Sequence, residues 1–446
     1  MSVSLIEIND RGVSVIDHSG VLRHISPGIA LLENDQVELG EAALRRTRLN
    51  PTRIINRFWS QLNLEPFSPA NRVARHYADL AYLHLMHVAE QTEISSEQEV
   101  IVAVPGSFSR EQLAIILGLL RQTPFKAVGM IDSALAGTVM VAESPSVLHL
   151  DLQLHQVLLT TFAESGGELQ RRSVVQLGDV GLHSMYEAMV HLTTGQFIQQ
   201  CRFNPQHSAA VEQELYNALP HWLSQSRHGN SLPLELNAGE KTYQAKLSWD
   251  SVVGKLEPHY RRIRAQMDKL VTADTEVVLT DAMAELPGLA EFLNLSGKTV
   301  SPAHLAEACT RHESLIRAAE ATHLVWKLPA NRAPATRPRQ ADVVGSQPPT
   351  HVLFRNSAIA LGRQVDIRNG ADSHLSSGSI ALNVRGLPES LGRISKVGED
   401  VFVEFGETGA LLNNRPVTGR QALTLGDRIG FPYTDEDLQL IEVQDV

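Results

Sequence analysis

The chain has 446 residues, of which 43% are apolar and 20% are charged. This balance is typical of a folded globular protein and excludes a disordered chain. The net charge of −11 and the pI near 5.9 argue against a broad binding surface for nucleic acid or for an anionic membrane.

The two cysteines, Cys201 and Cys309, stand far apart and form no CxxC pair. This spacing excludes a disulfide framework and a zinc site, and it favours a cytoplasmic protein. The first 17 residues contain no apolar core of a signal peptide. The longest apolar stretches, such as residues 113–120, are shorter than the roughly 20 residues of a membrane helix. No membrane insertion is therefore predicted.

The larger part of the chain alternates between strand-like and helix-like segments. Residues 3–8 and 13–17 predict a hairpin around a polar turn. Ser109 and Gln112 have the spacing of a capping box at the start of a helix. Further strands are predicted over residues 100–104, 147–150, 156–162, 232–236, 242–247 and 276–280, and helices after Gly181 and over residues 70–90, 208–224 and 249–270. This mixture predicts an α/β fold.

A stretch rich in proline, alanine and arginine, residues 328–349, follows this part. Its composition favours an extended linker, because it has no apolar period. It separates a domain at residues 1–327 from a domain at residues 350–446. In the second domain, short strands are predicted between turn signals at residues 352–354, 380–384, 401–405 and 428–431. This pattern predicts a small all-β sandwich.

Six segments of the first domain resemble, in the right order, the ATPase domain of the DnaK-type (70-kDa heat-shock) chaperones of the actin-like superfamily. They are residues 26–31, 38–52, 103–112, 131–137, 177–183 and 277–287. The resemblance covers about residues 1–325. It implies a two-lobed actin-like (ribonuclease-H-like) ATPase fold that binds ATP or ADP with magnesium.

The resemblance also implies roles for particular residues. Glu7 stands at the position of the metal-side aspartate, and Asp151 is the retained second aspartate. Arg57 stands at the position of the catalytic lysine, and Asp132 at that of the glutamate that positions water. Gly178 lies in the segment that resembles a further glycine-rich turn.

The phosphate-binding turns depart from the family pattern. Such turns need glycine, because backbone N–H groups must approach phosphate oxygens closely. Asn9 and Asp10 replace a glycine and a threonine in the first turn. The second turn, which includes Gln153 and His155, has lost all three glycines and the threonine.

The adenosine segment departs from the family in the same way. Asp281 and Ala282 replace its paired glycines, and Glu285 replaces the arginine that stacks on the base. Each such change costs about a kcal/mol or more, whereas micromolar binding totals only about 8 kcal/mol. We therefore expect no bound cofactor and no ATP hydrolysis.

The second domain resembles a forkhead-associated domain, a β-sandwich that binds phosphothreonine peptides. The resemblance covers about residues 350–435 and is carried by residues 361–363, 391–394, 409–414 and 425–429. It implies that phosphopeptide contacts are made by Arg363, Ser390, Arg393 and Asn413. Arg363 is equally compatible with a structural role, and a plain protein-docking module is the alternative.

Three smaller groups of residues favour structural roles. His76, His84 and His87 lack the carboxylate or cysteine that would complete a metal site, and they are interpreted as surface histidines of one helix. Ser107 and Ser109 follow a Pro-Gly pair without the GxSxG pattern of a nucleophile. The arginines at 45, 46, 48, 261, 262 and 264 are interpreted as solvated faces.

Two hypotheses about function follow. The first is a DnaK-like pseudo-ATPase that acts as a scaffold or adaptor and docks protein partners through its lobes and its tail. The alternative is a divergent ATPase whose nucleotide state controls partner binding, motivated by Asp151 and Arg57. An actin-like filament is less favoured, because no polymerising motif is visible. No nucleic-acid partner is predicted.

Overall fold

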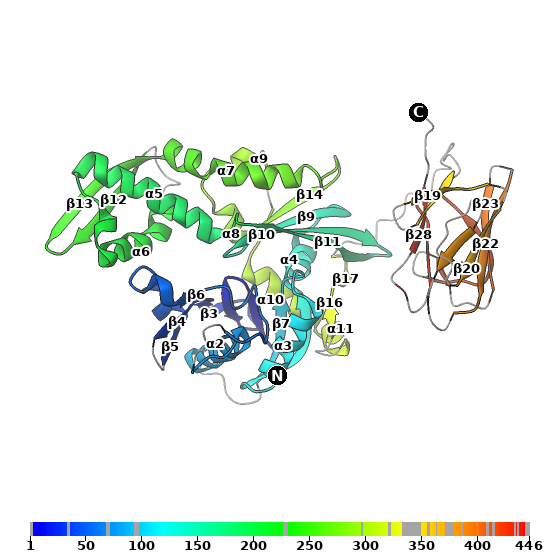
Figure 1. Cartoon of the computed structure of the whole chain (residues 1–446), viewed down its shortest axis with the longest axis horizontal. Helices are drawn as coiled ribbons and strands as arrows, with labels where there is room; N and C mark the ends of the chain where they lie inside the picture. Colours follow the sequence, from blue (N-terminus) through cyan, green and yellow to red (C-terminus); the bar gives the residue numbers. More distant parts are fainter. Residues whose placement is uncertain are drawn as a thin grey trace. The chain divides into compact units, whose positions relative to one another are not determined.

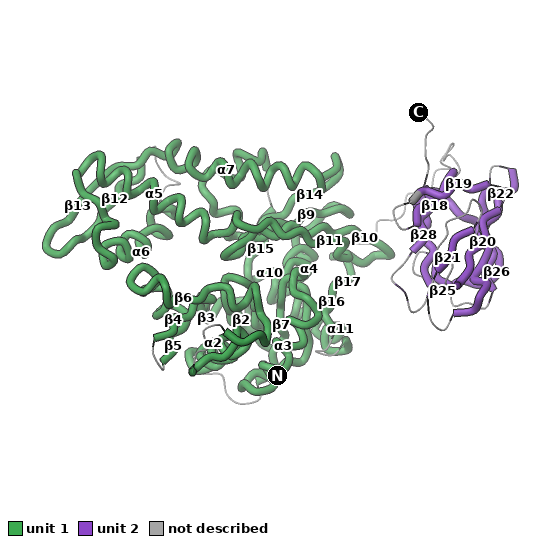
Figure 2. The backbone as a smooth tube through the Cα atoms, viewed as in Figure 1, with its two compact units in different colours: residues 1–334 green, residues 335–446 purple. Residues whose placement is uncertain are grey.

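The computed structural model divides the chain into two compact units, Met1–Pro334 and Ala335–Val446 (Figure 2). The residues that it describes are 3–33, 36–67, 72–92, 98–225, 231–295, 298–319, 323–331, 349–354, 357–362, 364–370, 379–382, 384, 387–398, 400–406, 410–412, 415–431, 434 and 437–441. The chain contains both helices and strands, and the strands form several sheets, so the predicted α/β class is confirmed.

The first sheet of the larger unit has the order β16–β8–β7–β1–β2–β3. Its strands are β1 (Ser4–Asn9), β2 (Gly12–Ile16), β3 (Leu22–Pro27), β7 (Gln98–Val104), β8 (Phe125–Asp132) and β16 (Leu324–Val325). The strands β1, β2 and β3 form an antiparallel meander, and β7, β8 and β16 continue the sheet in parallel from β1.

The second sheet has the order β15–β14–β9–β10–β11–β17. Its strands are β9 (Ser146–Leu152), β10 (Gln156–Ser165), β11 (Glu168–Gly178), β14 (Glu276–Thr280), β15 (Lys298–Val300) and β17 (Lys327–Pro329). Here β9, β10 and β11 form the antiparallel meander, and β14 and β15 continue it in parallel from β9. The same strand arrangement therefore occurs twice in one unit. Strand β17 ends two residues beyond position 327, where the sequence predicted the end of the first domain.

The remaining elements of this unit flank the two sheets (Figure 1). The strands are β4 (Ala30–Glu33), β5 (Gln36–Leu39), β6 (Ile54–Ile55), β12 (Ser231–Ala238) and β13 (Lys241–Ser248). The helices are α1 (Glu41–Leu44), α2 (Tyr77–Gln91), α3 (Arg110–Leu120), α4 (Ser133–Val141), α5 (Leu182–Cys201), α6 (Ala209–Gln225), α7 (Trp249–Met267), α8 (Asp281–Ala284), α9 (Leu289–Leu293), α10 (Pro302–Arg311) and α11 (Glu313–Ala318).

Local signals place several of these elements where they were predicted. The Ser109 hydroxyl accepts from the Gln112 backbone N–H at 3.2 Å, and the Gln112 side chain accepts from the Ser109 N–H at 2.9 Å. This capping box starts α3 and confirms the role of Ser109. Gly181 is the N-cap of α5, as predicted.

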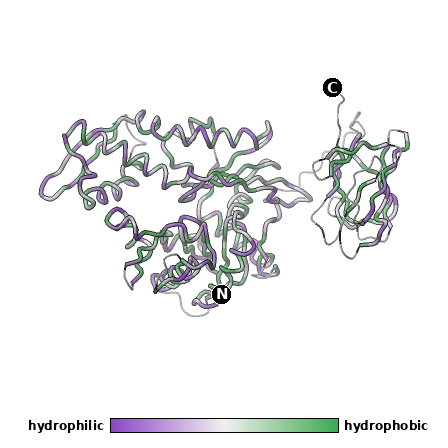
Figure 3. The backbone as a smooth tube through the Cα atoms, in the orientation of Figure 1, coloured by the Kyte–Doolittle hydropathy of each residue, from purple (hydrophilic) through white to green (hydrophobic). Residues whose placement is uncertain are grey.

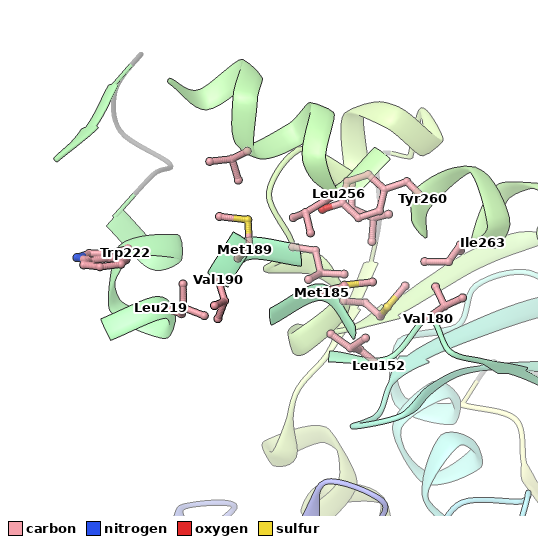
Figure 4. Close-up of a cluster of buried hydrophobic side chains, with 14 of the residues drawn as sticks. Leu152, Val180, Met185, Met189, Val190, Leu219, Trp222, Leu256, Tyr260 and Ile263 are labelled. Carbon is pink, nitrogen blue, oxygen red and sulfur yellow. The ribbon is translucent and has the colours of Figure 1, made fainter. Parts of the chain in front are cut away.

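The apolar residues of the larger unit form separate clusters on the faces of its sheets. One cluster lies between the second sheet and helices α5, α6 and α7, and includes Met185, Leu256 and Tyr260 (Figure 4). Phe197 belongs to the same cluster. A second cluster covers the first sheet against α2 and α3. A third combines residues of both sheets with α4 and α10. Apolar segments coincide with the central strands (Figure 3).

The predicted helix over residues 70–90 is shorter than expected, and its histidines are not all at the surface. Helix α2 begins at Tyr77, and His76 is its N-cap. His84 is fully buried, where it accepts from the Trp59 indole N–H at 3.0 Å and lies 2.7 Å from the Ser26 hydroxyl. Burial lowers the pKa of His84 to about 3. The interpretation of His84 as a surface histidine is therefore wrong.

The described part of the smaller unit contains strands and no helix, in a six-stranded and a five-stranded sheet. The strands are β18 (His351–Phe354), β19 (Ser357–Ala360), β20 (Gln364–Asn369), β21 (Ser379–Leu382), β22 (Ser390–Val397), β23 (Asp400–Phe405), β24 (Leu411–Leu412), β25 (Arg415–Pro416), β26 (Gly419–Leu423), β27 (Arg428–Gly430) and β28 (Asp437–Ile441). Both sheets contribute to one apolar cluster.

Candidate functional site

The turns that follow β1 and β9 are joined directly by the side chains of Asp10 and His155. The Asp10 carboxylate accepts from the backbone N–H of His155 at 2.7 Å and contacts the His155 Nδ1 at 3.0 Å. Nδ1 carries the hydrogen in this pair, because an ionised carboxylate only accepts. Asp10 is 1% exposed and His155 is 7% exposed. A carboxylate–imidazole pair therefore bridges the first and second sheets at these turns.

Beside each of the two turns, a carboxylate accepts a hydrogen bond from the side-chain amide two residues further along the chain. The Glu7 carboxylate on β1 accepts from the Asn9 side-chain amide at 3.3 Å. The Asp151 carboxylate on β9 accepts from the Gln153 amide at 3.1 Å. Burial, and then the charge of Asp151, raise the pKa of Glu7 to about 7. Asp151 therefore lies close enough to disfavour the ionisation of Glu7.

The N-terminus of α5 is occupied by the backbone of the second turn. The N–H groups of Leu182 and His183 donate to the carbonyls of Gln153 and Leu154, at 2.9 and 2.8 Å. Helix N-termini are ready anion sites when their N–H groups are free. A Cβ atom on Gly181 would lie 2.3 Å from the Gln156 nitrogen, so this close approach requires glycine. Two of the donors of α5 are therefore used inside the protein.

Asp132 is a buried structural carboxylate. It is fully buried at the end of β8, caps α4 by accepting from the Leu135 N–H at 3.2 Å, and forms an ion pair with Arg171 of β11. Burial raises its pKa, and the Arg171 charge opposes that shift. The Cβ of any larger residue at Gly106 would lie 2.0 Å from the Arg171 Nη1. This ion pair joins the two sheets and engages the acid that the resemblance assigned to positioning water.

The other predicted residues lie around this region in different settings. Arg57 is exposed in the loop after β6. Burial lowers the pKa of His183, and the charge of Arg57 adds to that shift. Gly178 ends β11, where its carbonyl accepts from the Arg262 guanidinium at 2.9 Å. Asp281 begins α8, and burial raises its pKa. Ala282 lines a cavity of about 210 Å³.

A single arginine links residues 44–48 to helices α5 and α6. Arg48 pairs with Glu187 on α5, lies 3.8 Å from the Glu212 carboxylate on α6, and stacks over the Tyr216 ring at 4.4 Å. Its backbone N–H donates to Gln213 at 2.7 Å. The interpretation of this arginine cluster as a solvated face is therefore wrong at Arg48, whose side chain is only 17% exposed. A more open cavity of about 610 Å³ lies beside this contact.

Sequence reasoning missed the Asp10–His155 pair, the Asp132–Arg171 pair and the Arg48 contacts. Their members are separated by 145, 39 and 139 positions or more. The only signal available was that charged or polar residues stand in both turns where the resemblance implies glycines. That coincidence was interpreted as loss of phosphate binding and not as a new contact.

The phosphopeptide residues predicted in the smaller unit are only partly described. Arg363 and Asn413 lie outside the described residues. Ser390 is exposed at the start of β22. Arg393 forms an ion pair with Asp366 at 3.0 Å, and the strand register places it opposite Glu404. Glu404 in turn lies opposite Arg420. Arg393 therefore belongs to a row of alternating charges across four strands.

Within the described ranges, no group of three or more histidine, cysteine or acidic residues is arranged to hold a metal ion. None of the helices in those ranges is long and apolar enough to cross a membrane. No protein-family model matches this chain, and no curated protein is significantly similar to it.

Proposed function

We propose that the larger unit is a DnaK-type, actin-like (ribonuclease-H-like) domain that has become a pseudo-ATPase scaffold, and that the smaller unit is a forkhead-associated-like sandwich. In this proposal both units dock protein partners in the cytoplasm, and nucleotide does not control them. The repeated strand arrangement of the two six-stranded sheets supports the fold part of the proposal.

The Asp10–His155 pair is the observation that carries the proposal. In a nucleotide-binding member of this fold, the phosphates would lie between the two turns that this pair joins. Here the carboxylate and the imidazole contact each other at 3.0 Å and are both buried. A phosphate group would have to break this pair and then face the Asp10 carboxylate, and both effects oppose binding.

Closure between the sheets is also provided without a ligand. The Asp132–Arg171 and Arg48–Glu187 ion pairs join segments that belong to different sheets or to the elements around them. A nucleotide in an ATPase of this kind stabilises the closed form through its own contacts. In this chain, protein side chains supply such contacts. We therefore expect the larger unit to keep one conformation without nucleotide.

The test is titration calorimetry of the purified chain with ATP and with ADP, each with magnesium. We expect no heat of binding at nucleotide concentrations on the order of 1 mM, where a Kd of 1 mM corresponds to about −4 kcal/mol. A repeat at a second temperature excludes a binding enthalpy that happens to be zero. Micromolar binding would overturn the scaffold proposal.

The alternative, a divergent ATPase, is favoured by one observation. Glu7 and Asp151 remain near each other beside the turns, where a magnesium–phosphate group would need oxygen ligands. If this alternative holds, ATP turnover is measurable and disappears in Asp151→Ala. If the scaffold proposal holds, the wild-type chain and the variant have the same background rate.

Partner docking through the smaller unit is tested with peptides. A phosphothreonine peptide library is compared with the same peptides lacking the phosphate. Selective capture of phosphopeptides that is lost in Arg363→Ala would support a phosphate-dependent tail. Equal capture of both libraries would support a plain docking module.

A further inference from the structure

A cavity of about 210 Å³ lies between the first turn, helices α5, α6 and α7, and the segment after α8. Its apolar lining includes Leu152, Met185, Met189, Leu256 and Leu286. Figure 4 shows the first four of these among the side chains of the same cluster. Met185, Met189 and Leu256 are each 1% exposed, so one wall of the cavity belongs to the core.

Three polar groups line the same cavity. They are the Arg11 guanidinium, the Glu285 carboxylate and the Tyr186 hydroxyl. Among the described residues, no hydrogen bond or ion pair engages any of these three side-chain groups. Arg11 and Glu285 are also not paired with each other. A cation, an anion and a hydroxyl group are therefore all available to a ligand.

The charges of Arg11 and Glu285 both affect the Tyr186 hydroxyl. Burial raises the pKa of Tyr186, the positive charge of Arg11 opposes the shift, and the negative charge of Glu285 adds to it. Both charges therefore lie within electrostatic range of the Tyr186 hydroxyl. Together they offer opposite charges in a cavity whose other lining is mostly apolar.

This arrangement discriminates between ligand classes. A nucleotide carries only negative charge on its phosphates, so it would pair with Arg11 but be repelled by Glu285. Drug-sized ligands usually occupy cavities of about 300–1,000 Å³, and 210 Å³ suits a smaller molecule. A small zwitterion with an apolar body satisfies both charges and the apolar wall. Methionine side chains adapt well to such bodies.

We propose that this cavity binds a free α-amino acid with an apolar side chain, such as leucine, methionine or phenylalanine. The α-carboxylate pairs with the Arg11 guanidinium, which binds planar carboxylates bidentately. The α-ammonium pairs with Glu285, and the side chain contacts Met185 and Met189. The ligand makes no covalent bond. The scaffold would then be a sensor of amino acids as well as a docking platform.

The experiment measures binding of L-leucine, L-methionine and L-phenylalanine to the full chain by titration calorimetry and by the NMR shifts of ¹³C-methyl methionine. Three probes each lack one feature of L-leucine: 4-methylpentanoate lacks the ammonium, 3-methylbutylamine lacks the carboxylate, and glycine lacks the apolar side chain. We expect the Met185 and Met189 methyl signals to move with leucine. Each incomplete probe should bind about tenfold more weakly or not at all.

Two charge-removing variants test the assigned contacts. Arg11→Gln and Glu285→Gln should each weaken leucine binding by about tenfold, because each removes one charged contact. Arg121→Gln and Glu240→Gln are matched controls, because both residues are exposed and lie outside the cavity. The controls should bind leucine like the wild-type chain. Circular dichroism of all four variants checks that the fold is retained.

The proposal is overturned if no amino acid moves the Met185 and Met189 signals at about 10 mM, well above the millimolar range of weak metabolite binding. It is equally overturned if 4-methylpentanoate and 3-methylbutylamine bind as well as leucine. ATP with magnesium is titrated in parallel. Nucleotide binding would overturn the pseudo-ATPase proposal alone, whereas failure of leucine with no nucleotide binding would overturn only this one.

Discussion

Asp10 and His155 show how polar residues in two separate turns can become one interaction. Together they form a buried, hydrogen-bonded pair. Breaking a buried pair by removing one partner leaves an uncompensated polar group, which usually costs about 3–5 kcal/mol. We therefore expect this pair to stabilise the fold.

This stabilisation is measurable in a double-mutant cycle. His155→Ala should lower the free energy of unfolding by about 3 kcal/mol, because it leaves the Asp10 carboxylate with the backbone N–H donor alone. Asp10→Ala and the double variant complete the cycle, and denaturant unfolding gives each value. We expect a coupling energy of at least about 1 kcal/mol. His207→Ala is an exposed control, and additivity of the two substitutions would contradict the inferred pair.

Glu7 makes stability depend on pH in a direction unusual for a carboxylate. Its pKa is raised to about 7 in the folded protein, so between roughly pH 4.5 and 7 the folded state binds more protons than the unfolded state. Its contribution to stability is therefore present at acidic pH and is lost as the pH rises through 7. Replacing Glu7 by glutamine removes this pH dependence of stability.

Glu7→Gln should therefore stabilise the chain at pH 8 by about 2–3 kcal/mol relative to wild type, and by little at pH 4. Unfolding in denaturant at several pH values measures the difference between the two chains, in which the other titrating groups cancel. Glu240→Gln, an exposed acid, should show no such trend. A stability difference that does not change with pH would contradict the raised pKa.

At the scale of elements, one arginine of residues 44–48 contacts two helices. Arg48 is the arginine of this segment that forms ion pairs with α5 and α6. Arg48 engages Glu187 and Glu212 and stacks over Tyr216. Its ionic and ring contacts are partly buried, so they are worth more than an exposed ion pair. The neighbouring Arg45 pairs only with Glu41 on its own helix, and both side chains are exposed.

Arg48→Ala should cost about 1–2 kcal/mol and Arg45→Ala less than about 0.5 kcal/mol. Hydrogen exchange should become faster in α6 and in residues 41–50 of Arg48→Ala, because the two segments lose the side-chain contacts of Arg48. Exchange in the smaller unit should stay the same. Equal effects of the two substitutions would show that Arg48 does not hold these elements together.

At the scale of the molecule, each apolar cluster draws its residues from one unit. The clusters that contain Phe197 and Val403 share no residue. We therefore expect two unfolding transitions in calorimetry of the full chain. Val403→Ala should lower the transition of the smaller unit by about 1–3 kcal/mol, since it leaves a cavity in that core. Phe197→Ala should lower only the other transition, and a single shared transition would contradict independent cores.

The sequence alone was sufficient where local chemistry decides the outcome. Strand-like segments predicted β9, β10, β12, β13 and β14, and Ser109 with Gln112 predicted the start of α3. Turn residues predicted the β1–β2 hairpin. The short edge strands and the late start of α2 at Tyr77 were not predicted, because they depend on neighbouring strands and loops and not on local periodicity.

The contacts of the candidate site were decided by the tertiary structure. The sequence carried no information that Asp10 would meet His155 or that Arg171 would reach Asp132. Contacts between residues so far apart depend on how the two meanders face each other, which local preferences do not specify. Arg11, Tyr186 and Glu285 are likewise far apart in the sequence, and it is the tertiary structure that brings them to one cavity.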